Sequence, residues 1–332
     1  MATMADVARR AGVSVATVSH VLNETRPVRR PTRDAVHAAI AELGYTHNTL
    51  ARSLVTSRTK SIGLAVSAIS NPYFTEIFQG VEASALEAGY SLLITDPHDD
   101  PEHELKTVRL LHERRVDGMI IAPSADPGAM LEHLARTNVP AVFLDRLVDG
   151  DHDQVCAENE APTARLARHL AERGHTRIAL VAGAPGLSTT TERLAGYRAG
   201  LAAAGLPYVP ELVVGGDSRA EGAERAVHRL LALAAPPTAL VTANNAMTIG
   251  ALRALRTARL SVPDDMALAC FDDFSWADLF EPRLTAVAQP SREIGAAAVR
   301  LLLDRLAEPD RAPRTLRLPC AFVHRSSCGC AG

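Results

Sequence analysis

The sequence is poor in aromatic residues and in cysteine, and it contains no long apolar run. Only 4% of its 332 residues are aromatic and five are cysteine. Because the cysteines are scattered and odd in number, no disulfide framework is expected. No stretch approaches the roughly 18 apolar residues that a membrane-spanning helix needs, and no charged-then-apolar leader opens the chain. These absences favour a cytoplasmic protein.

The sequence also lacks the motifs of several common enzyme classes. No Gly-x-Gly-x-x-Gly follows an expected strand, and no phosphate-binding loop ends in Gly-Lys-Ser/Thr. The segment "GLSTT" (186–190) lacks the second glycine of a nucleophile elbow. The segment "LHERRV" (111–116) lacks the second histidine of a zinc-protease helix. The sequence therefore predicts a protein that is not an enzyme and needs no cofactor.

Two groups of metal-ligating residue types occur, and neither predicts a metal site. The first lies in "DPHDDPEH", where acidic residues before a helix are better explained by helix capping. Its members are His98, Asp99, Asp100 and His103. The second is the pair Cys328 and Cys330 in "CGC", which could bind a soft metal but has no evident partner ligands. We therefore predict no bound metal.

Charge is unevenly distributed along the chain, although the net charge is only −3. Residues 1–60 contain nine Lys and Arg but four Asp and Glu, a formal charge of +5, so the remainder carries −8. A basic N-terminal region on an acidic body is typical of proteins that bind nucleic acid. An uneven but merely solvated surface is the alternative.

The basic N-terminal region predicts three short helices. Thr3, with Asp6 three residues later, forms a capping-box pattern at the start of the first helix. After a turn at Gly12, Ser14 caps the second helix, and a third helix ends at Gly44. Two helices joined by a tight turn are the helix-turn-helix pattern. A small helical bundle without a role on DNA is the alternative.

The second helix, "SVATVSHVLN", has small side chains on its outer face, which suits insertion into the DNA major groove. The chain resembles the LacI (lactose-repressor) family, including its galactose- and purine-repressor-like members. The resemblance lies in "MADVARRAGVSVATVSHVLN", "RDAVHAAIAELGY", "ARSL" and "KSIGL". It implies base contacts from Val15, Ala16 and His20, of which His20 can donate to guanine. Thr17 and Arg26 are further predicted DNA contacts.

The resemblance also identifies "NTLARSLVTSR" (48–58) as a hinge helix. It implies that Leu54 wedges into the minor groove and kinks the duplex. Ala51 is small enough for two such helices to pack together, and Arg52 can meet phosphates. Because so short a helix is marginal alone, we expect it to form only on DNA and in a dimer. A flexible basic linker is the alternative.

From residue 61 onwards, strand-like apolar runs alternate with helical runs, which predicts doubly wound parallel sheets. The series restarts after "VCAENEAP", so two similar α/β halves with a ligand cleft at their strand ends are expected. "RVDGMII", "HLAERGHTRIALVAG" and "VPDDMALACFDD" resemble the periplasmic-binding-protein-like core of the same family. The implied domains are a helix-turn-helix domain at 1–47, a hinge at 48–60 and a core at 61–332, with halves 61–159 plus 289–320, and 160–288.

Five residues are predicted to bind an effector in the cleft. Tyr73 and Phe74, expected in a loop after a strand, suit stacking on a sugar or base ring, and packing on the core is the alternative. By the resemblance, Arg193 gives two hydrogen bonds to the effector and Asp272 accepts from its hydroxyls. Asn244 is implied as a further polar cleft residue.

The predicted cleft departs from the purine-repressor pattern at Leu187 and Ser218, which stand where that pattern has an arginine and an aromatic residue. Both changes remove purine contacts, so a sugar is the expected effector and a purine or nucleoside the alternative. Asp145 and Asn159, near the crossover between the halves, have either a ligand-binding or a structural role.

These patterns predict a repressor that binds a roughly palindromic DNA operator as a homodimer. An effector that closes the cleft controls it allosterically, through its difference in affinity for two states. The expected location is the bacterial cytoplasm, on the nucleoid when DNA is bound. A solute-binding protein of a sugar transporter is the main alternative. A sugar-converting enzyme would need a second carboxylate beside Asp272.

Overall fold

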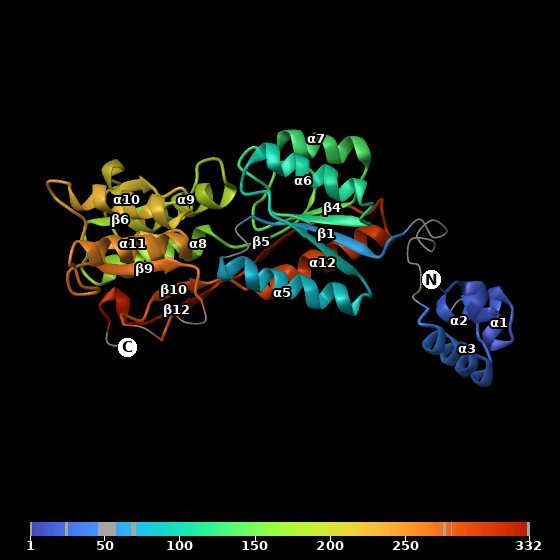
Figure 1. Cartoon of the computed structure of the whole chain (residues 1–332). Coiled ribbons are helices and arrows are strands. Elements are labelled where there is room, and N and C mark those ends of the chain that lie inside the picture. Colours follow the sequence, from blue (N-terminus) through green and yellow to red (C-terminus); the bar gives the residue numbers. More distant parts are fainter. Residues whose placement is uncertain are drawn as a thin grey trace. The chain divides into compact units, whose positions relative to one another are not determined.

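The computed structural model describes residues 2–23, 26–45, 58–67, 71–274, 277–279 and 281–330. It divides into two compact units, residues 1–59 and 60–332, which we call the head and the core (Figure 1). Within the described ranges, no helix combines the length and apolar character required to span a membrane.

The head contains the three predicted helices, α1 (Met4–Ala11), α2 (Val15–Asn23) and α3 (Arg30–Leu43). Thr3 and Asp6 form the predicted capping box, and Gly12 ends α1 in the left-handed conformation at φ 68°. Ser14 Oγ accepts from the Thr17 amide at 3.1 Å, as a cap of α2 should. The buried apolar residues of the three helices form one small core, made of Val7, Ala8, Val18, Val21, Val36 and Ala39.

The first subdomain of the core is a six-stranded sheet in the order β11-β5-β4-β3-β1-β2, with every neighbouring pair parallel. Helices α5 and α12 cover one face of this sheet, and α6 and α7 cover the other (Figure 1). The strands are β1 (Ser61–Ala65), β2 (Ser91–Thr95), β3 (Gly118–Ile121), β4 (Ala141–Leu144), β5 (Asp153–Ala157) and β11 (Thr315–Leu318). The helices are α5 (Pro72–Glu87), α6 (Pro101–Glu113), α7 (Gly128–Thr137) and α12 (Ser291–Ala307).

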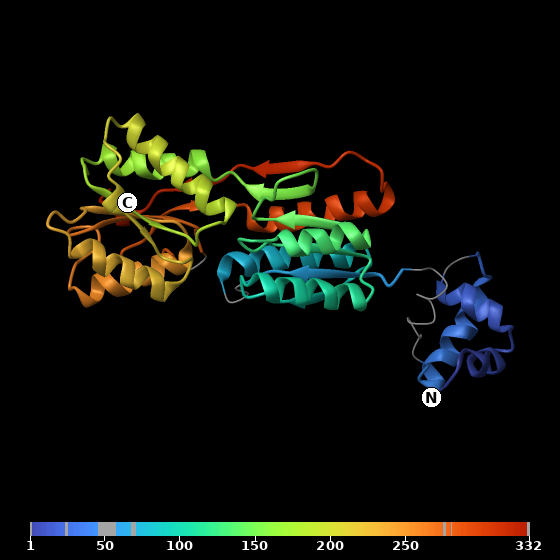
Figure 2. The ribbon, with the colours of Figure 1, turned by 90° about the horizontal axis from the view of Figure 1, so that it is seen from above.

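The second subdomain is a six-stranded sheet in the order β12-β10-β9-β8-β6-β7, parallel except for the antiparallel edge strand β12. Helices α8 and α9 pack together on one face, and α10 and α11 pack together on the other (Figure 2). The strands are β6 (Ile178–Ala182), β7 (Val213–Gly215), β8 (Ala239–Thr242), β9 (Ala267–Phe271), β10 (Thr285–Ala288) and β12 (Ala321–Val323). The helices are α8 (Glu160–Glu172), α9 (Ser188–Ala203), α10 (Ala220–Leu231) and α11 (Asn245–Thr257), with single 3-10 turns η1 (Pro210–Leu212) and η2 (Ser326–Cys328).

The alternation of strands and helices thus gives two doubly wound sheets, as predicted. Central strands such as β3 and β9 are buried along their whole length, which explains their continuous apolar sequences. The late run 315–327 divides between the two sheets, because β11 pairs with β5 whereas β12 pairs with β10. Residues 321–330 therefore lie with the second subdomain, to which the sequence did not assign them.

The prediction that Tyr73 and Phe74 lie in a loop is wrong, because both belong to the first turn of α5 and are buried. Asn71 caps this helix by accepting from the Tyr73 amide at 2.9 Å. Pro72 occupies the first helical turn, where its missing N–H costs nothing. The helix therefore begins three residues before the apolar periodicity indicated.

Close helix packing in the first subdomain depends on glycine. A Cβ on Gly80 of α5 would lie 2.2 Å from the Arg292 carbonyl oxygen of α12, which is backbone and cannot rotate away. We expect Gly80→Val to destabilise the protein by about 3 kcal/mol through overpacking. Urea unfolding measures this as a lower midpoint. Gly128→Val, at an exposed helix start whose Cβ would meet only the Asp126 carboxylate at 3.6 Å, is the control. Equal midpoints for the two variants would contradict the packing argument.

Candidate effector-binding cleft and DNA-binding surface

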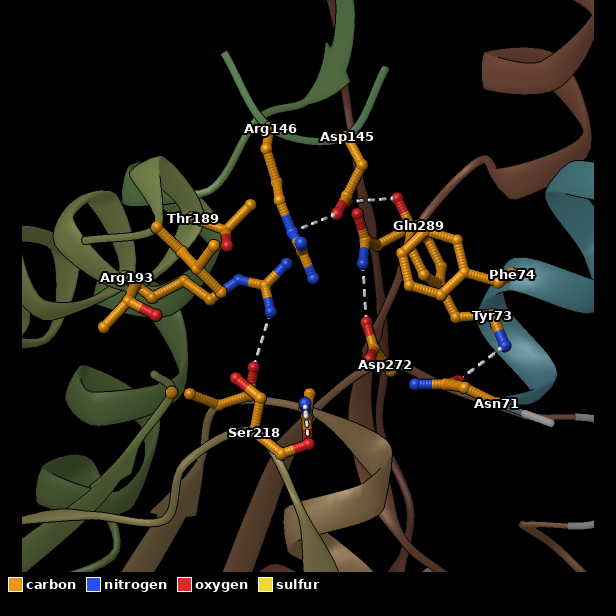
Figure 3. Close-up of a pocket in the computed structure, with 15 residues that line it drawn as sticks. Asn71, Tyr73, Phe74, Asp145, Arg146, Thr189, Arg193, Ser218, Asp272 and Gln289 are labelled. Atoms are coloured by element: carbon orange, nitrogen blue, oxygen red, sulfur yellow. Dashed lines mark hydrogen bonds and ion pairs between the residues drawn. The ribbon is translucent and has the colours of Figure 1, made fainter. Parts of the chain in front are cut away.

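A polar pocket lies between the two subdomains of the core, with a cavity volume of about 40 Å³ (Figure 3). Several lining residues directly follow the carboxyl end of a strand, where open α/β sheets bind ligands. These residues are Asp145 after β4, Gly183 after β6, Ala243 after β8, Asp272 after β9 and Gln289 after β10. A cavity this size has room for only a few water molecules. A larger ligand therefore requires the two subdomains to separate or the lining side chains to move.

Arg193 is held rigidly at this pocket. It lies on α9, is 7% exposed, and its guanidinium points into the space between the subdomains (Figure 3). Nε donates to Asn159 Oδ1 at 2.8 Å, and one terminal nitrogen donates to the Ala243 carbonyl oxygen at 2.5 Å. The guanidinium carbon lies 3.7 Å from the centroid of the Phe271 ring, a cation–π contact. The guanidinium is thus pre-positioned to donate further hydrogen bonds to a ligand.

Asp272 and Asp145 supply buried acceptors at the same pocket. Gln289 Nε2 donates to Asp272 Oδ1 at 2.6 Å, and the Asn245 amide donates to Oδ2 at 3.2 Å. Burial raises the pKa of Asp272, and the nearby charge of Arg193 opposes this rise. The Tyr73 hydroxyl donates to Asp145 at 2.7 Å, and burial together with the Asp145 charge raises the Tyr73 pKa far above its usual value. Hydrogen-bond donors and acceptors, together with positively and negatively charged side chains, therefore converge on one small volume.

Three pocket residues adopt the left-handed backbone conformation, which costs free energy for residues other than glycine. The φ angles are 66° at Asp145, 56° at Ser218 and 75° at Asp272. All three follow strand ends of the core. Such strain gathers where side chains must be aimed at a ligand, which supports a binding role for this pocket.

The structure brings all five predicted effector residues to this one pocket: Tyr73, Phe74, Arg193, Asn244 and Asp272. Asn244 also caps α11, because its Oδ1 accepts from the Met247 amide at 2.7 Å. Of the two residues left open, Asp145 lines the pocket, whereas Asn159 lies behind Arg193 and orients it. Leu187 and Ser218, where the sequence departs from the purine pattern, both line the pocket.

Sequence reasoning missed several polar lining residues, namely Asn71, Arg146, Thr189, Thr190 and Gln289. Gln289 directly follows a buried apolar strand, and that position alone could have identified it. Arg146 is recognisable only from the structure, where it pairs with Asp99 and donates to the Pro123 carbonyl oxygen at 2.9 Å. In the group His98, Asp99, Asp100 and His103, for which helix capping was predicted, Asp100 caps α6 by accepting from the His103 amide at 2.8 Å.

A chain of polar contacts links the pocket to the junction between the subdomains. Asn159, which accepts from Arg193, donates to Glu192 Oε2 at 2.9 Å. The other Glu192 oxygen accepts from Arg317 of β11 at 2.6 Å, so α9 of the second subdomain is tied to the sheet of the first. Arg193 is therefore connected through Asn159 and Glu192 to Arg317 in the sheet of the first subdomain.

In the head, the start of α2 is the exposed apolar surface. Val15 is 46% exposed and Ala16 is also exposed, whereas Val18 is fully buried. Thr17 and His20 are half-buried, and the Thr17 hydroxyl lies 2.9 Å from that of Ser14. Arg26 is exposed between α2 and α3. The predicted hinge contacts lie outside the described residues: Ala51, Arg52 and Leu54.

A helix-turn-helix head joined to a two-subdomain core with a polar interdomain cleft defines the class of ligand-controlled DNA-binding regulators built on a periplasmic-binding-protein-like core. Residues 3–48 match the family "Bacterial regulatory proteins, lacI family", and residues 167–328 match "Periplasmic binding protein-like domain". The chain belongs to the LacI family of bacterial regulators.

Relatives and solved structures agree with this assignment over nearly the whole chain. The ribose operon repressor of Escherichia coli K12 is 38% identical over 98% of this chain and all of its own length. The transcriptional repressor PurR of Erwinia tasmaniensis is 37% identical over 98% of this chain and 97% of its own. The lac repressor dimer bound to operator and the anti-inducer ONPF superposes with a TM-score of 0.88 at 30% identity, covering 98% of this chain and 99% of that one. The regulator CelR in complex with cellobiose gives a TM-score of 0.76 at 31% identity, covering 98% and 100%.

Proposed function

We propose that a small sugar is the effector of this chain, a ligand-controlled DNA-binding transcriptional repressor. The observation that carries the proposal is the pairing of Arg193 and Asp272 at one buried, polar pocket of about 40 Å³. Hydroxyl groups both donate and accept, so a polyhydroxylated ligand can use the arginine and the carboxylate at once. The resemblance to a ribose operon repressor supports a compact sugar in particular.

The lining residues favour a sugar over a purine. Tyr73 and Phe74, whose ring centroids are 5.0 Å apart, give an apolar wall for the C–H face of a sugar ring. On the opposite subdomain, Leu187 and Ser218 provide neither a second aromatic surface nor an arginine for a purine ring. Ser218 Oγ already accepts from the Ala184 amide at 2.9 Å. A planar base would therefore stack on one side only.

Control of DNA binding follows from the position of the pocket between the subdomains. A ligand that bridges Arg193 of the second subdomain and Asp145 of the first favours one relative placement of the two. Because Arg193 is linked through Asn159 and Glu192 to Arg317, ligand binding would also affect these contacts at the junction between the subdomains. The effector acts through its difference in affinity for the two placements.

The DNA-contacting residues and the assembly are part of the same proposal. Val15, Ala16, Thr17 and His20 of α2 and Arg26 would face the operator, with the hinge at 48–60 supplying the minor-groove contacts. Two chains would place two heads on a roughly palindromic site; the similar lac repressor is bound to its operator as a dimer. The proposed domain boundaries remain 1–47 for the helix-turn-helix domain, 48–60 for the hinge, and 61–332 for the effector-binding and dimerisation region. The relatives are repressors, so no catalytic step is proposed.

A thermal-shift screen followed by an operator-binding assay tests the proposal. We expect a pentose or a hexose to raise the melting temperature in proportion to the logarithm of its concentration, and to change operator affinity. DNA affinity itself should fall steeply with salt, because phosphate contacts release counterions. A palindromic duplex should bind more tightly than a half-site. A purine as the sole stabilising ligand would refute the sugar assignment, and salt-independent or absent DNA binding would refute DNA recognition.

A further inference from the structure

Four side chains of metal-ligating types gather at one place in the second subdomain. None of them lines the effector pocket. They are His169, His324, Cys328 and Cys330, and their ligand atoms all lie within 4.8 Å of one another. Cys328 Sγ lies 3.6 Å from His324 Nε2, and Cys330 Sγ lies 3.8 Å from His169 Nε2. In the part of the chain that the structure describes, no other group of histidine, cysteine and acidic residues meets this spacing.

We propose that these four side chains form a tetrahedral Cys₂His₂ zinc site that fastens the C-terminal segment to α8. Zinc lies about 2.3 Å from thiolate sulfur and about 2.0 Å from imidazole nitrogen. The edges of such a tetrahedron are therefore about 3.3–3.8 Å long. The Cys328–His324 and Cys330–His169 separations already fall in this range. The remaining separations are at most 4.8 Å and have to shorten by up to about one ångström, and the exposed His324 is the ligand with the most room to move.

The backbone holds the two cysteines toward the same point. Gly329, between them, has φ 81°, a left-handed conformation that reverses the chain so that both thiols face α8. Ser327 Oγ donates to the Leu268 carbonyl oxygen at 2.6 Å, which anchors the turn on β9. Arg173, which follows α8, donates to the Gly329 carbonyl oxygen at 2.9 Å. The ligands are thus pre-positioned by contacts that do not involve a metal.

The donor set and its charge select a soft-to-borderline divalent metal. Two thiolates and two neutral imidazoles make a neutral site with one Zn²⁺, and two thiol protons are released on binding. The Thr285 hydroxyl lies 3.2 Å from Cys328 Sγ, the kind of outer contact that stabilises a bound thiolate. Cys328 is fully buried, whereas His169 and Cys330 are half-buried, so a metal can enter from the His324 side.

The proposed site has a structural rather than a catalytic role, because four protein ligands leave no open position for a substrate. His169 lies in the last turn of α8, and the other three ligands follow β12 at the C-terminal end of the chain. A bound metal would link the first helix of the second subdomain to its last segment. It would therefore stabilise the second subdomain against unfolding without contacting the effector pocket.

Metal binding is tested on the full chain, purified under reducing conditions and stripped with a chelator. After the stripped protein is reloaded with zinc and dialysed, elemental analysis should find one equivalent of Zn²⁺ per chain. The melting temperature of the reloaded protein should be several degrees above that of the stripped protein. Co²⁺ titration should give the visible bands of a tetrahedral site and a thiolate charge-transfer band in the near ultraviolet. Zinc should then displace the cobalt spectrum completely.

Single substitutions identify the ligands. Cys330→Ser, at a half-buried position, should lower metal affinity at least about 100-fold and halve the charge-transfer intensity per bound cobalt. His324→Asn should lower the affinity while leaving that intensity per bound cobalt unchanged. Cys320→Ser and His228→Asn make the same chemical changes elsewhere and should leave stoichiometry at one. Less than a tenth of an equivalent of zinc, or a cobalt spectrum unchanged in Cys330→Ser, would overturn the proposal. So would a Cys328–Cys330 disulfide, seen as loss of two titratable thiols, that persists under the reducing conditions of the assay.

Discussion

Arg193→Ala should abolish the response of the repressor to its effector while leaving operator binding intact. The substitution removes charge-assisted hydrogen bonds worth about 1.5–3 kcal/mol each. It also leaves the Asn159 Oδ1 and Ala243 acceptors without their donor. Loss of two such bonds to the ligand corresponds to a fall in affinity of about 100-fold or more. Isothermal titration with the stabilising sugar measures the affinity, and an operator-binding assay with and without that sugar measures the response.

Arg198→Ala is the matched control for this prediction. Arg198 lies on the same helix, α9, but is exposed and contacts Tyr208 rather than the pocket. It should retain wild-type effector affinity. Because Arg193 also hydrogen-bonds to Asn159 and to the Ala243 carbonyl oxygen, its loss can lower stability. Both variants are therefore titrated well below their melting temperatures. Wild-type sugar affinity in folded Arg193→Ala would show that this arginine only supports the structure of the cleft.

Val15→Glu should remove operator binding without harming the fold. Val15 is the first residue of α2 and is 46% exposed, so it makes little contribution to the core of the head. A carboxylate in the first turn of a helix interacts favourably with the helix dipole, so stability should be unchanged or slightly higher. When the head binds DNA, the same carboxylate is repelled by the negatively charged phosphates, and such like-charge contacts cost several kcal/mol. We expect a loss of operator affinity of at least about 100-fold.

The control makes an identical change of charge on another face of the head. Ala38 is exposed on α3 and is not among the predicted contacts. Ala38→Glu should lower operator affinity only a few-fold, through the general change in net charge. Fluorescence anisotropy with an operator duplex at one fixed salt concentration compares the two variants. Equal losses would mean that α2 does not enter the groove and that the head binds DNA through charge alone.

Much of the fold follows from the sequence because the signals that specify it are local. Caps such as Thr3, Ser14 and Gly12 act over three or four residues, and each occupies the predicted position. The alternation of apolar strands and amphipathic helices likewise predicts two doubly wound sheets. The start of α5 was missed because Asn71 and Pro72 initiate a helix whose first turn carries aromatic residues rather than a helical periodicity.

The membership of the effector pocket was only partly predictable. Arg193 and Asp272 were implied by resemblance to a family, and Tyr73 and Phe74 by their adjacency. Arg146 gave no such signal, because its role depends on Asp99, 47 residues earlier. Folding places the ends of β4, β6, β8, β9 and β10 at one cleft, and only that arrangement shows which polar residues share it.

The sequence by itself determined the class of this protein: a basic helix-turn-helix head, the strand–helix alternation of a two-subdomain core, and the absence of common enzyme motifs. Only the tertiary structure decided which distant side chains meet. Cys328 and Cys330, with His324 four residues before the first of them, were not identified as a site, because the fourth side chain, His169, lies about 160 residues earlier on α8. Secondary structure is set by neighbours in the chain, whereas a binding site is set by packing, which joins residues that no local pattern relates.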